Sequence, residues 1–239
     1  MRTIPTIIHQ IWSDSEMPLP EHFKVLCDTW KKDYPEWEYR LWNDQMMDQF
    51  VQEHYPQYWN IYSRFPYNVQ RWDAMRYLIL DKMGGMYIDV DYESLSPINE
   101  LIENKTCCFA QEPKSHCKAF EKFKREIDQV FNNAMILCTP GHPFIRKVIN
   151  TVFREETLNY NESKQFCVYN TTGPWMLIDL YCDLTEEEKK EIYLIPYQYV
   201  TPFDVPQARR VIMGEESEEL EQCLENAYAV HYFWGGWKQ

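Results

Sequence analysis

Hydrophobic positions along this chain alternate between short continuous runs and stretches with helical spacing. Residues 5–12 form a short, β-branched apolar run and residues 37–42 alternate in polarity, so both are predicted strands. Residues 20–32 carry large apolar side chains at helical spacing and predict a helix. The same criteria predict strands at 107–111, 134–138, 192–195 and 228–233, and helices at 118–131, 143–156 and 174–183.

The clearest predicted helix covers residues 68–83. Asn68 can cap its start, and Gly84-Gly85 ends it. A strand follows directly at 86–90. Strands interleaved with helices indicate an α/β fold with a largely parallel or mixed sheet. Ligands of such sheets bind beyond the carboxyl ends of strands, which directs attention to the residues just after 88.

Composition limits the classes of function. The chain has 239 residues, 45% of them hydrophobic, and no repeat or Gly/Ser linker, so residues 1–239 are predicted to form one domain. The formal net charge of −13 excludes a nucleic-acid polymer as partner. A nucleotide could still bind where a metal or local hydrogen-bond donors offset its charge.

The cysteines and the N-terminus bear on localisation. None of the eight Cys lies in a C-x-x-C pair, so a zinc ribbon is excluded. The first residues resemble neither a signal peptide nor an anchor, and no run of 18 apolar residues occurs. A cytoplasmic protein is therefore expected.

A basic segment at 114–125 adds a further expectation. It carries five basic residues against one acidic residue, and Phe120, Phe123, Ile127 and Val130 would form an apolar stripe on the predicted helix. One interpretation is an ordinary helix docked on the core. The other is peripheral contact with the inner membrane, where lipid-linked acceptors reside.

The strongest chemical signal is Asp89-Val90-Asp91 at the end of a buried strand. Period-two alternation places both carboxylates on one side of the chain. Two close like charges repel, and a divalent cation is the natural partner to hold them together. Oxygen ligands favour Mg²⁺ or Mn²⁺ over zinc. Such an ion can neutralise the charge that builds on a departing nucleotide.

Two further groups accompany this pair. Asp73 and Arg76 share one face of the preceding helix, either as an ordinary ion pair or as a grip on sugar hydroxyls and phosphate. The aromatic tail from His231 to Trp237 offers an imidazole for a metal and a Gly-Gly pair whose N–H groups can approach phosphate. The alternative for the tail is a strand packed into the core.

Taken together, these segments resemble a known family. The stretches IPTIIHQIW, EYRLWND, RWDAMRYLILDKMGGMYIDVDYESLSPI, NNAMILCTPGHPF, TTGPW and HYFWGGW are similar, in this order, to the DXD-containing sugar transferases of glycosyltransferase family 32. That family includes yeast mannosyltransferases, an animal α-1,4-galactosyltransferase and bacterial capsule and lipopolysaccharide transferases. The central D-x-x-R-Y, Gly-Gly, Y-x-D-x-D block is the most specific part, and it also occurs in clostridial glucosylating toxins.

The resemblance implies a GT-A fold, a single Rossmann-like domain with a central mixed, mostly parallel sheet. It also implies a catalytic set formed by Asp89, Asp91, Asp73 and Arg76. The implied contacts are Trp12, Gln10 and Asp89 for the nucleotide, Asp73, Arg76, Asn133 and Trp237 for the sugar, and Asp89, Asp91 and His231 for Mn²⁺ or Mg²⁺. The tail departs from the family in one respect, because Gly236 stands where a Ser is frequent and leaves only backbone contacts there.

The predicted function is retaining, metal-dependent transfer of a hexose, galactose or glucose, from a UDP-sugar to a hydroxyl of a glycan or lipid-linked acceptor in surface polysaccharide synthesis. Three alternatives stay open: a GDP-mannose-dependent mannosyltransferase, a non-catalytic nucleotide-sugar-binding protein, and a nucleotide-sugar hydrolase. The acceptor could attack from the face that the diphosphate leaves, or a carboxylate could act as nucleophile in a double displacement.

Overall fold

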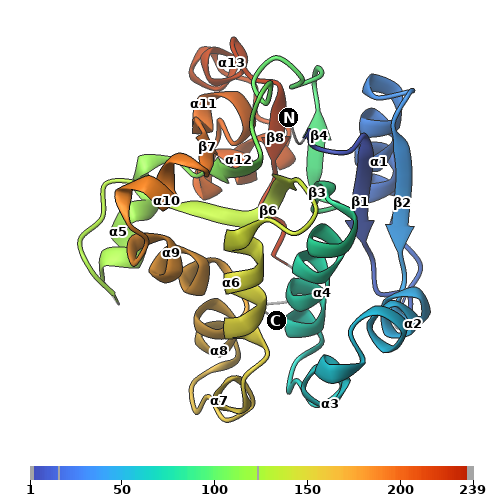
Figure 1. Ribbon diagram of the computed structural model, residues 1–239. Coiled ribbons are helices and arrows are strands. Elements are labelled where there is room, and N and C mark those ends of the chain that lie inside the picture. The colour runs from blue at the N-terminus through green and yellow to red at the C-terminus, as the bar shows by residue number, and fades with distance from the viewer. Residues whose placement is uncertain (1–2, 16, 123, 236–239) are drawn as a thin grey trace.

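A mixed β-sheet lies at the centre of the molecule, with helices on both faces (Figure 1). The computed structural model describes residues 3–15, 17–122 and 124–235. In this part of the chain the central sheet has six strands in the order β2-β1-β3-β6-β5-β7. These strands are β1 (Ile7–Ile11), β2 (Glu38–Trp42), β3 (Gly85–Ile88), β5 (Cys107–Gln111), β6 (Phe131–Cys138) and β7 (Tyr193–Ile195).

Strand direction follows the predicted pattern of a mixed, mostly parallel sheet. β1 runs parallel to β2 and β3, and β5 runs parallel to β7. β6 alone is antiparallel to its neighbours β3 and β5. The α/β fold class is therefore confirmed, and the carboxyl ends of β1, β2 and β3 meet at one edge of the sheet.

The helices alternate with the strands along the chain. They are α1 (Glu21–Asp33), α2 (Asp44–His54), α3 (Trp59–Tyr62), α4 (Asn68–Met83), α5 (Cys117–Glu121), α6 (Pro143–Val152), α7 (Glu155–Leu158), α8 (Lys164–Thr171), α9 (Pro174–Cys182), α10 (Glu186–Lys190), α11 (Tyr197–Val200), α12 (Val205–Ile212) and α13 (Glu218–Leu224). Short 3₁₀ turns at Pro56–Tyr58 and Lys114–His116 lie between them. None of the described helices is long and apolar enough to cross a membrane.

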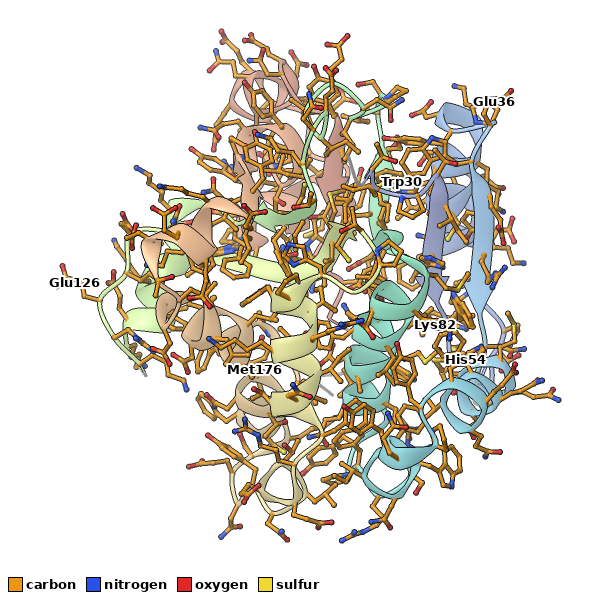
Figure 2. All side chains as sticks on the ribbon, in the orientation of Figure 1. Trp30, Glu36, His54, Lys82, Glu126 and Met176 are labelled. Carbon is orange, nitrogen blue, oxygen red and sulfur yellow. The ribbon has the colours of Figure 1, made fainter. Side chains whose placement is uncertain are left out.

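Two apolar clusters hold the helices to the sheet. On one face α2, α4, α6 and α9 pack against strand side chains that include Tyr87 and Phe109. On the other face Met86 and Ile88 meet α1 and α11. The alternation of Met86, Tyr87 and Ile88 between faces is the strand periodicity expected for a sheet covered on both sides. Figure 2 shows Trp30 inside the molecule, whereas Glu36 and Glu126 lie at its edge.

A second, small sheet completes the face that carries α1. β4 (Tyr92–Ser94) and β8 (Ala229–His231) pair antiparallel, with Tyr92 opposite His231. The two rings stack with centroids 4.4 Å apart. This pairing holds the end of the described chain beside the residues that follow β3.

The predicted helix at 68–83 is confirmed as α4, although its cap differs. Tyr67, not Asn68, occupies the N-cap position, and its backbone N–H donates to the side chain of Gln70. Gly84 then adopts φ 65° and Gly85 φ 99°. A Cβ on Gly84 would lie 2.6 Å from Pro140 Cδ, so only glycine allows α4 to turn this tightly into β3.

Two predicted helices are wrong in extent. The helix expected at 118–131 is limited to α5, and β6 begins at Phe131, three residues before its predicted start. Phe120 and Val130 are buried, Lys124 and Arg125 pair with Asp179 at 2.9 and 2.8 Å, and Phe123 lies outside the described residues. The described residues of this segment therefore do not form the predicted amphipathic helix. The helix expected at 143–156 instead divides into α6 and α7.

His9 is buried under α4 and held by two hydrogen bonds. Its Nε2 lies 3.0 Å from the carbonyl of Gly84, and its Nδ1 lies 3.2 Å from the indole nitrogen of Trp42. An indole N–H can only donate, so Nδ1 must accept and the ring must be neutral. Burial lowers the pKa of His9 from 6.5 to about 4. A proton on Nδ1 would oppose the Trp42 N–H directly.

We therefore expect the free energy of unfolding to fall by about 3 kcal/mol between pH 7 and pH 4 because of His9 alone. The unfolded chain takes up this proton below about pH 6.5, whereas the folded chain takes it up only near pH 4. Urea unfolding at several pH values, compared with His9→Gln, isolates the effect from other titrating groups. Equal pH dependence in the two proteins would contradict it.

Candidate metal and donor-sugar site

Asp89 follows the last residue of β3, on the same side of the chain as Tyr87 and α4. Its backbone N–H donates to the carbonyl of Ala134 at 2.8 Å, so the sheet fixes its position. Its Oδ1 accepts from Arg76 Nη1 at 3.1 Å and from the Tyr87 hydroxyl at 2.6 Å. One carboxylate oxygen is thus held by the protein, and the side chain remains partly exposed.

Asp91 lies where the chain turns from β3 into β4. Its Oδ2 accepts the backbone N–H of Trp234 at 2.8 Å, and its Oδ1 lies 3.4 Å from Nε2 of His231. Its carbonyl accepts from the N–H of Tyr232 at 3.0 Å. The pairing of β4 with β8 produces these contacts. It brings the segment that contains Asp89 and Asp91 next to the segment that begins at His231.

The three predicted metal ligands converge. Asp89, Asp91 and His231 each offer one atom, and these atoms lie within 4.8 Å of one another. Nδ1 of His231 is buried and has no hydrogen-bond partner among the described residues. Two carboxylates and an imidazole fit a divalent cation, and the nitrogen ligand suits Mn²⁺ better than Mg²⁺. The chemistry of the donor set thus agrees with the predicted cofactor.

The charges in this cluster influence one another. Burial raises the pKa of Asp89, although Arg76 opposes the rise. Burial would also raise the pKa of Asp91, but His231 and the Trp234 N–H hold it below its usual range. The same carboxylates raise the pKa of His231 against the effect of burial. Asp91 and His231 therefore each favour the charged form of the other.

Asp73 and Arg76 form a buried network next to Asp89. Nη2 of Arg76 contacts Asp73 Oδ1 at 2.9 Å, and Nη1 donates to the carbonyl of Asn133 at 2.6 Å. Asp73 also accepts from the Asn133 amide at 2.8 Å and from the Thr172 hydroxyl at 2.9 Å. Burial raises the pKa of Asp73 to about 6. The pair is thus no exposed surface ion pair, and Asn133 belongs to the same cluster.

The predicted nucleotide contacts lie beside this cluster. Gln10 is fully buried behind Asp89, with its Nε2 3.3 Å from the Asp89 carbonyl and its Oε1 2.6 Å from the Tyr39 hydroxyl. Its side chain is therefore engaged by the protein, and its structural role is to support Asp89. The Trp12 indole N–H donates to the carbonyl of Met17 at 3.0 Å. Trp237 lies outside the described residues, as does Gly236.

Several contributors were not singled out from the sequence. Thr172 and Tyr87 occur in the quoted motifs, and their polar groups turn out to hold Asp73 and Asp89. Arg209 on α12 donates to the carbonyls of Phe233 and Trp234 at 3.1 and 3.0 Å. It fixes the segment that contacts Asp91. The sequence pattern did not indicate a role for Arg209, because the helix that carries it, α12, was not predicted.

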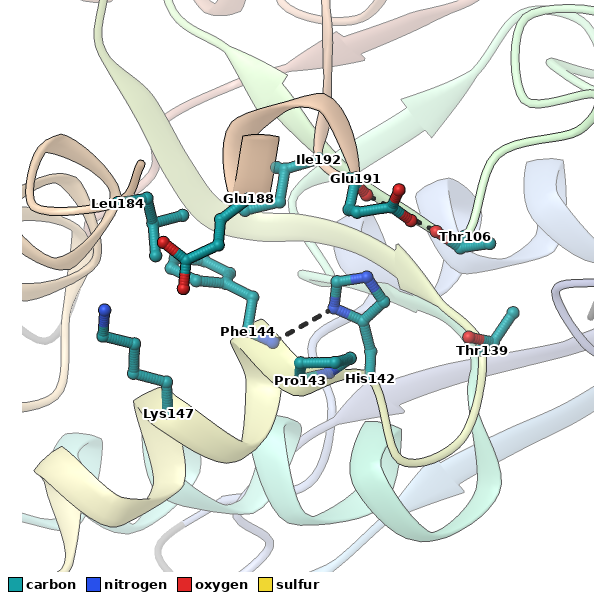
Figure 3. Close-up of a pocket in the computed structure, with 10 residues that line it drawn as sticks. All are labelled: Thr106, Thr139, His142, Pro143, Phe144, Lys147, Leu184, Glu188, Glu191 and Ile192. Carbon is teal, nitrogen blue, oxygen red and sulfur yellow. Dashed lines mark hydrogen bonds between the residues drawn. The ribbon is translucent and has the colours of Figure 1, made fainter. Parts of the chain in front are cut away.

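A separate pocket of about 290 Å³ lies away from this site (Figure 3). It surrounds the start of α6, where His142 accepts the N–H of Phe144 at 3.3 Å. β3 and β6 are antiparallel, and Gly85 at the start of β3 pairs with Cys138 at the end of β6. The end of β6 therefore lies next to the amino end of β3, whereas Asp89 follows its carboxyl end. This pocket is therefore not part of the acidic cluster.

Comparison with known proteins agrees with this geometry. A family model described as the glycosyltransferase sugar-binding region containing the DXD motif matches residues 20–108, which include the acidic pair and its supporting helix. Residues 20–108 therefore carry the DXD region of this glycosyltransferase family. Inositol phosphoceramide mannosyltransferase 2 of Schizosaccharomyces pombe is 41% identical over 176 residues, which cover 72% of this chain and 44% of that protein.

Two further similarities extend this comparison. Inositol phosphoceramide mannosyltransferase 1 of the same yeast is 26% identical over 200 residues, covering 82% of this chain and 57% of that protein. The chain thus spans about half the length of these two relatives. The solved PaToxG glycosyltransferase has a TM-score of 0.55 at 15% identity and covers 95% of this chain and 90% of its own. This likeness shows the fold, which is of the GT-A type.

Proposed function

We propose that this chain transfers mannose from GDP-mannose to a hydroxyl of a glycan or lipid-linked acceptor, with retention at the anomeric carbon and with help from Mn²⁺. The mannosyltransferase names of its yeast relatives support mannose over the galactose or glucose predicted first. These relatives are about twice as long, so the donor and acceptor are assigned here as proposals. The observation that carries the proposal is the convergence of Asp89, Asp91 and His231 beside a buried Asp–Arg network.

Each residue has a part in this scheme. A cation on Asp89, Asp91 and His231 would neutralise the charge that develops on the departing diphosphate. Arg76 holds the carboxylate of Asp89 in place through its ion pair, and it adds positive charge near the position of the diphosphate. Asn133 and Asp73 are hydrogen-bonded to each other and would contact the donor sugar. Arg76 lies between Asp73 and Asp89 and links them to the acidic pair.

The structure also bears on how the acceptor attacks. The bond from the sugar C1 to the diphosphate oxygen breaks, and a bond from C1 to the acceptor oxygen forms, while the acceptor proton passes to the leaving phosphate oxygen. A double displacement needs a carboxylate free to attack C1. Both oxygens of Asp73 already accept hydrogen bonds from protein groups. We therefore favour attack from the face that the diphosphate leaves.

A donor panel tests the proposal. GDP-mannose, UDP-galactose, UDP-glucose and UDP-N-acetylhexosamines are each incubated with Mn²⁺ or EDTA, with and without mannose- or inositol-containing acceptors, and released nucleotide is measured. We expect Mn²⁺-dependent release from GDP-mannose that an acceptor accelerates. Release from a UDP-sugar alone would replace the donor assignment, and equal release without acceptor would indicate a hydrolase. Binding without release under every condition would indicate a non-catalytic binding protein.

A further inference from the structure

A small polar cavity lies between the carboxyl ends of β1 and β2 and the start of α4. Its volume is about 140 Å³, and its lining includes Ser15, Asp44, Asp48, Tyr62, Arg71 and Trp72. This is smaller than the roughly 300–1,000 Å³ of a pocket for a whole drug-sized ligand. The cavity would therefore accept one part of a nucleotide rather than all of it.

Two features of the fold place the cavity near the donor-sugar site. Arg71 and Trp72 immediately precede Asp73 on α4. The loop that contains Ser15 follows β1, the strand that lies beside β3 in the sheet. A nucleotide with its diphosphate at the acidic pair can extend along this edge of the sheet, so that its base reaches the ends of β1 and β2.

The polar groups of the cavity are not all satisfied. Oδ2 of Asp44 accepts from the Ser13 hydroxyl at 2.7 Å and from the Ser15 N–H at 3.2 Å. Asp48 makes no hydrogen bond or ion pair within the described part of the chain, and burial raises its pKa. Nε of Arg71 is buried and has no hydrogen-bond partner there. One carboxylate and one guanidinium thus line the same small space with unused bonding capacity.

We propose that this cavity binds the guanine base of the donor, with Asp48 accepting from guanine N1–H and the 2-amino group, and Arg71 donating to O6. The inference rests on the proposed function and names the residues that select its nucleotide. Guanine presents two adjacent donors to a carboxylate and an acceptor edge to an arginine. Uracil presents one N–H between two carbonyls, so the second oxygen of Asp48 would face a carbonyl oxygen. Adenine presents an acceptor at N1, which Asp48 would oppose.

Calorimetric titration with GDP, inosine diphosphate and UDP, each with Mn²⁺, tests this assignment. Inosine diphosphate lacks only the 2-amino group. We expect the wild-type chain to bind it about 10-fold more weakly than GDP, because a hydrogen bond to a charged group is lost. Asp48→Asn should bind GDP about 10- to 100-fold more weakly, should bind UDP at least as tightly as the wild type does because the amide can donate to a uracil carbonyl, and should no longer distinguish GDP from inosine diphosphate.

Glu53→Gln is the matched control, since it removes the same charge from the exposed side of α2, where Glu53 is 63% exposed. Its GDP affinity should be unchanged. Equal wild-type affinity for GDP and inosine diphosphate would overturn the guanine assignment without any variant. Mn²⁺-dependent GDP binding that Asp48→Asn leaves intact would overturn it and leave the proposed function standing. Binding of UDP but not GDP would overturn both the guanine assignment and the donor.

Discussion

Replacing Asp91 by Asn is expected to reduce Mn²⁺-dependent release of nucleotide from the donor by about 10³-fold or more. Asp91 is the carboxylate with the lowered pKa, and both of its oxygens face groups from the end of the chain. The amide keeps the shape and can still accept the Trp234 N–H, but it removes the negative charge that a cation requires. Initial rates of nucleotide release at saturating Mn²⁺ measure the effect.

The control for this change is Asp28→Asn, which removes one negative charge from α1, where Asp28 is 67% exposed and pairs with Lys31. It should retain wild-type activity. Thermal unfolding of Asp91→Asn without metal checks that the fold is intact. If a folded Asp91→Asn kept more than about a tenth of the metal-dependent rate, Asp91 could not be a metal ligand in the active enzyme.

Replacing Arg76 by Met should lower the free energy of unfolding by about 3–5 kcal/mol, because it leaves Asp73 and Asp89 without their buried cation. Arg76 is only 5% exposed. The pKa of Asp73, already raised to about 6, would rise further without Arg76. The folded variant would then take up protons as the pH falls, so the loss should be smaller at pH 5 than at pH 8. Urea unfolding at both pH values measures it.

Arg64→Met provides the comparison, because Arg64 pairs with Glu155 on the surface, where the side chains are 50% and 57% exposed. Its cost should not exceed about 1 kcal/mol. The double change Arg76→Met with Asp73→Asn should recover part of the loss, since one of the two unpaired charges is also removed. A loss below about 1 kcal/mol for Arg76→Met at pH 8 would show that the buried pair is not important for stability.

Elements with one dominant periodicity could be predicted from the sequence. α4 was placed with both ends correct because its apolar spacing begins after Asn68 and two glycines end it, although Tyr67 rather than Asn68 occupies the N-cap position. The end of α5 and the start of β6 were harder to predict, because Lys124 and Arg125 continue a charged, helix-like pattern across a segment that tertiary ion pairs hold in a loop. Short helices such as α12 carry too few residues for their spacing to be distinctive.

The residues of the candidate site also differ in how far the sequence alone could predict their contacts. Asp73 and Arg76 lie on α4, and Asp89 and Asp91 directly follow β3, so local spacing could predict the proximity of these four residues. The position of His231 came from family resemblance, and its contact with Asp91 depends on the pairing of β4 with β8, which no local pattern specifies. The cavity around Asp48 depends on three segments that meet only in the folded chain.

The pairing of β4 with β8 also determines when the site can exist. The hydrogen bond from Trp234 to Asp91 joins residues 143 positions apart. Closing so long a loop costs chain entropy that local contacts do not offset until β8 docks against β4. A growing chain would carry Asp89 and Asp91 long before it contains His231. Tight cation binding therefore becomes available only once synthesis has passed β8, so the ability to bind the ion reports that the chain has been made through His231.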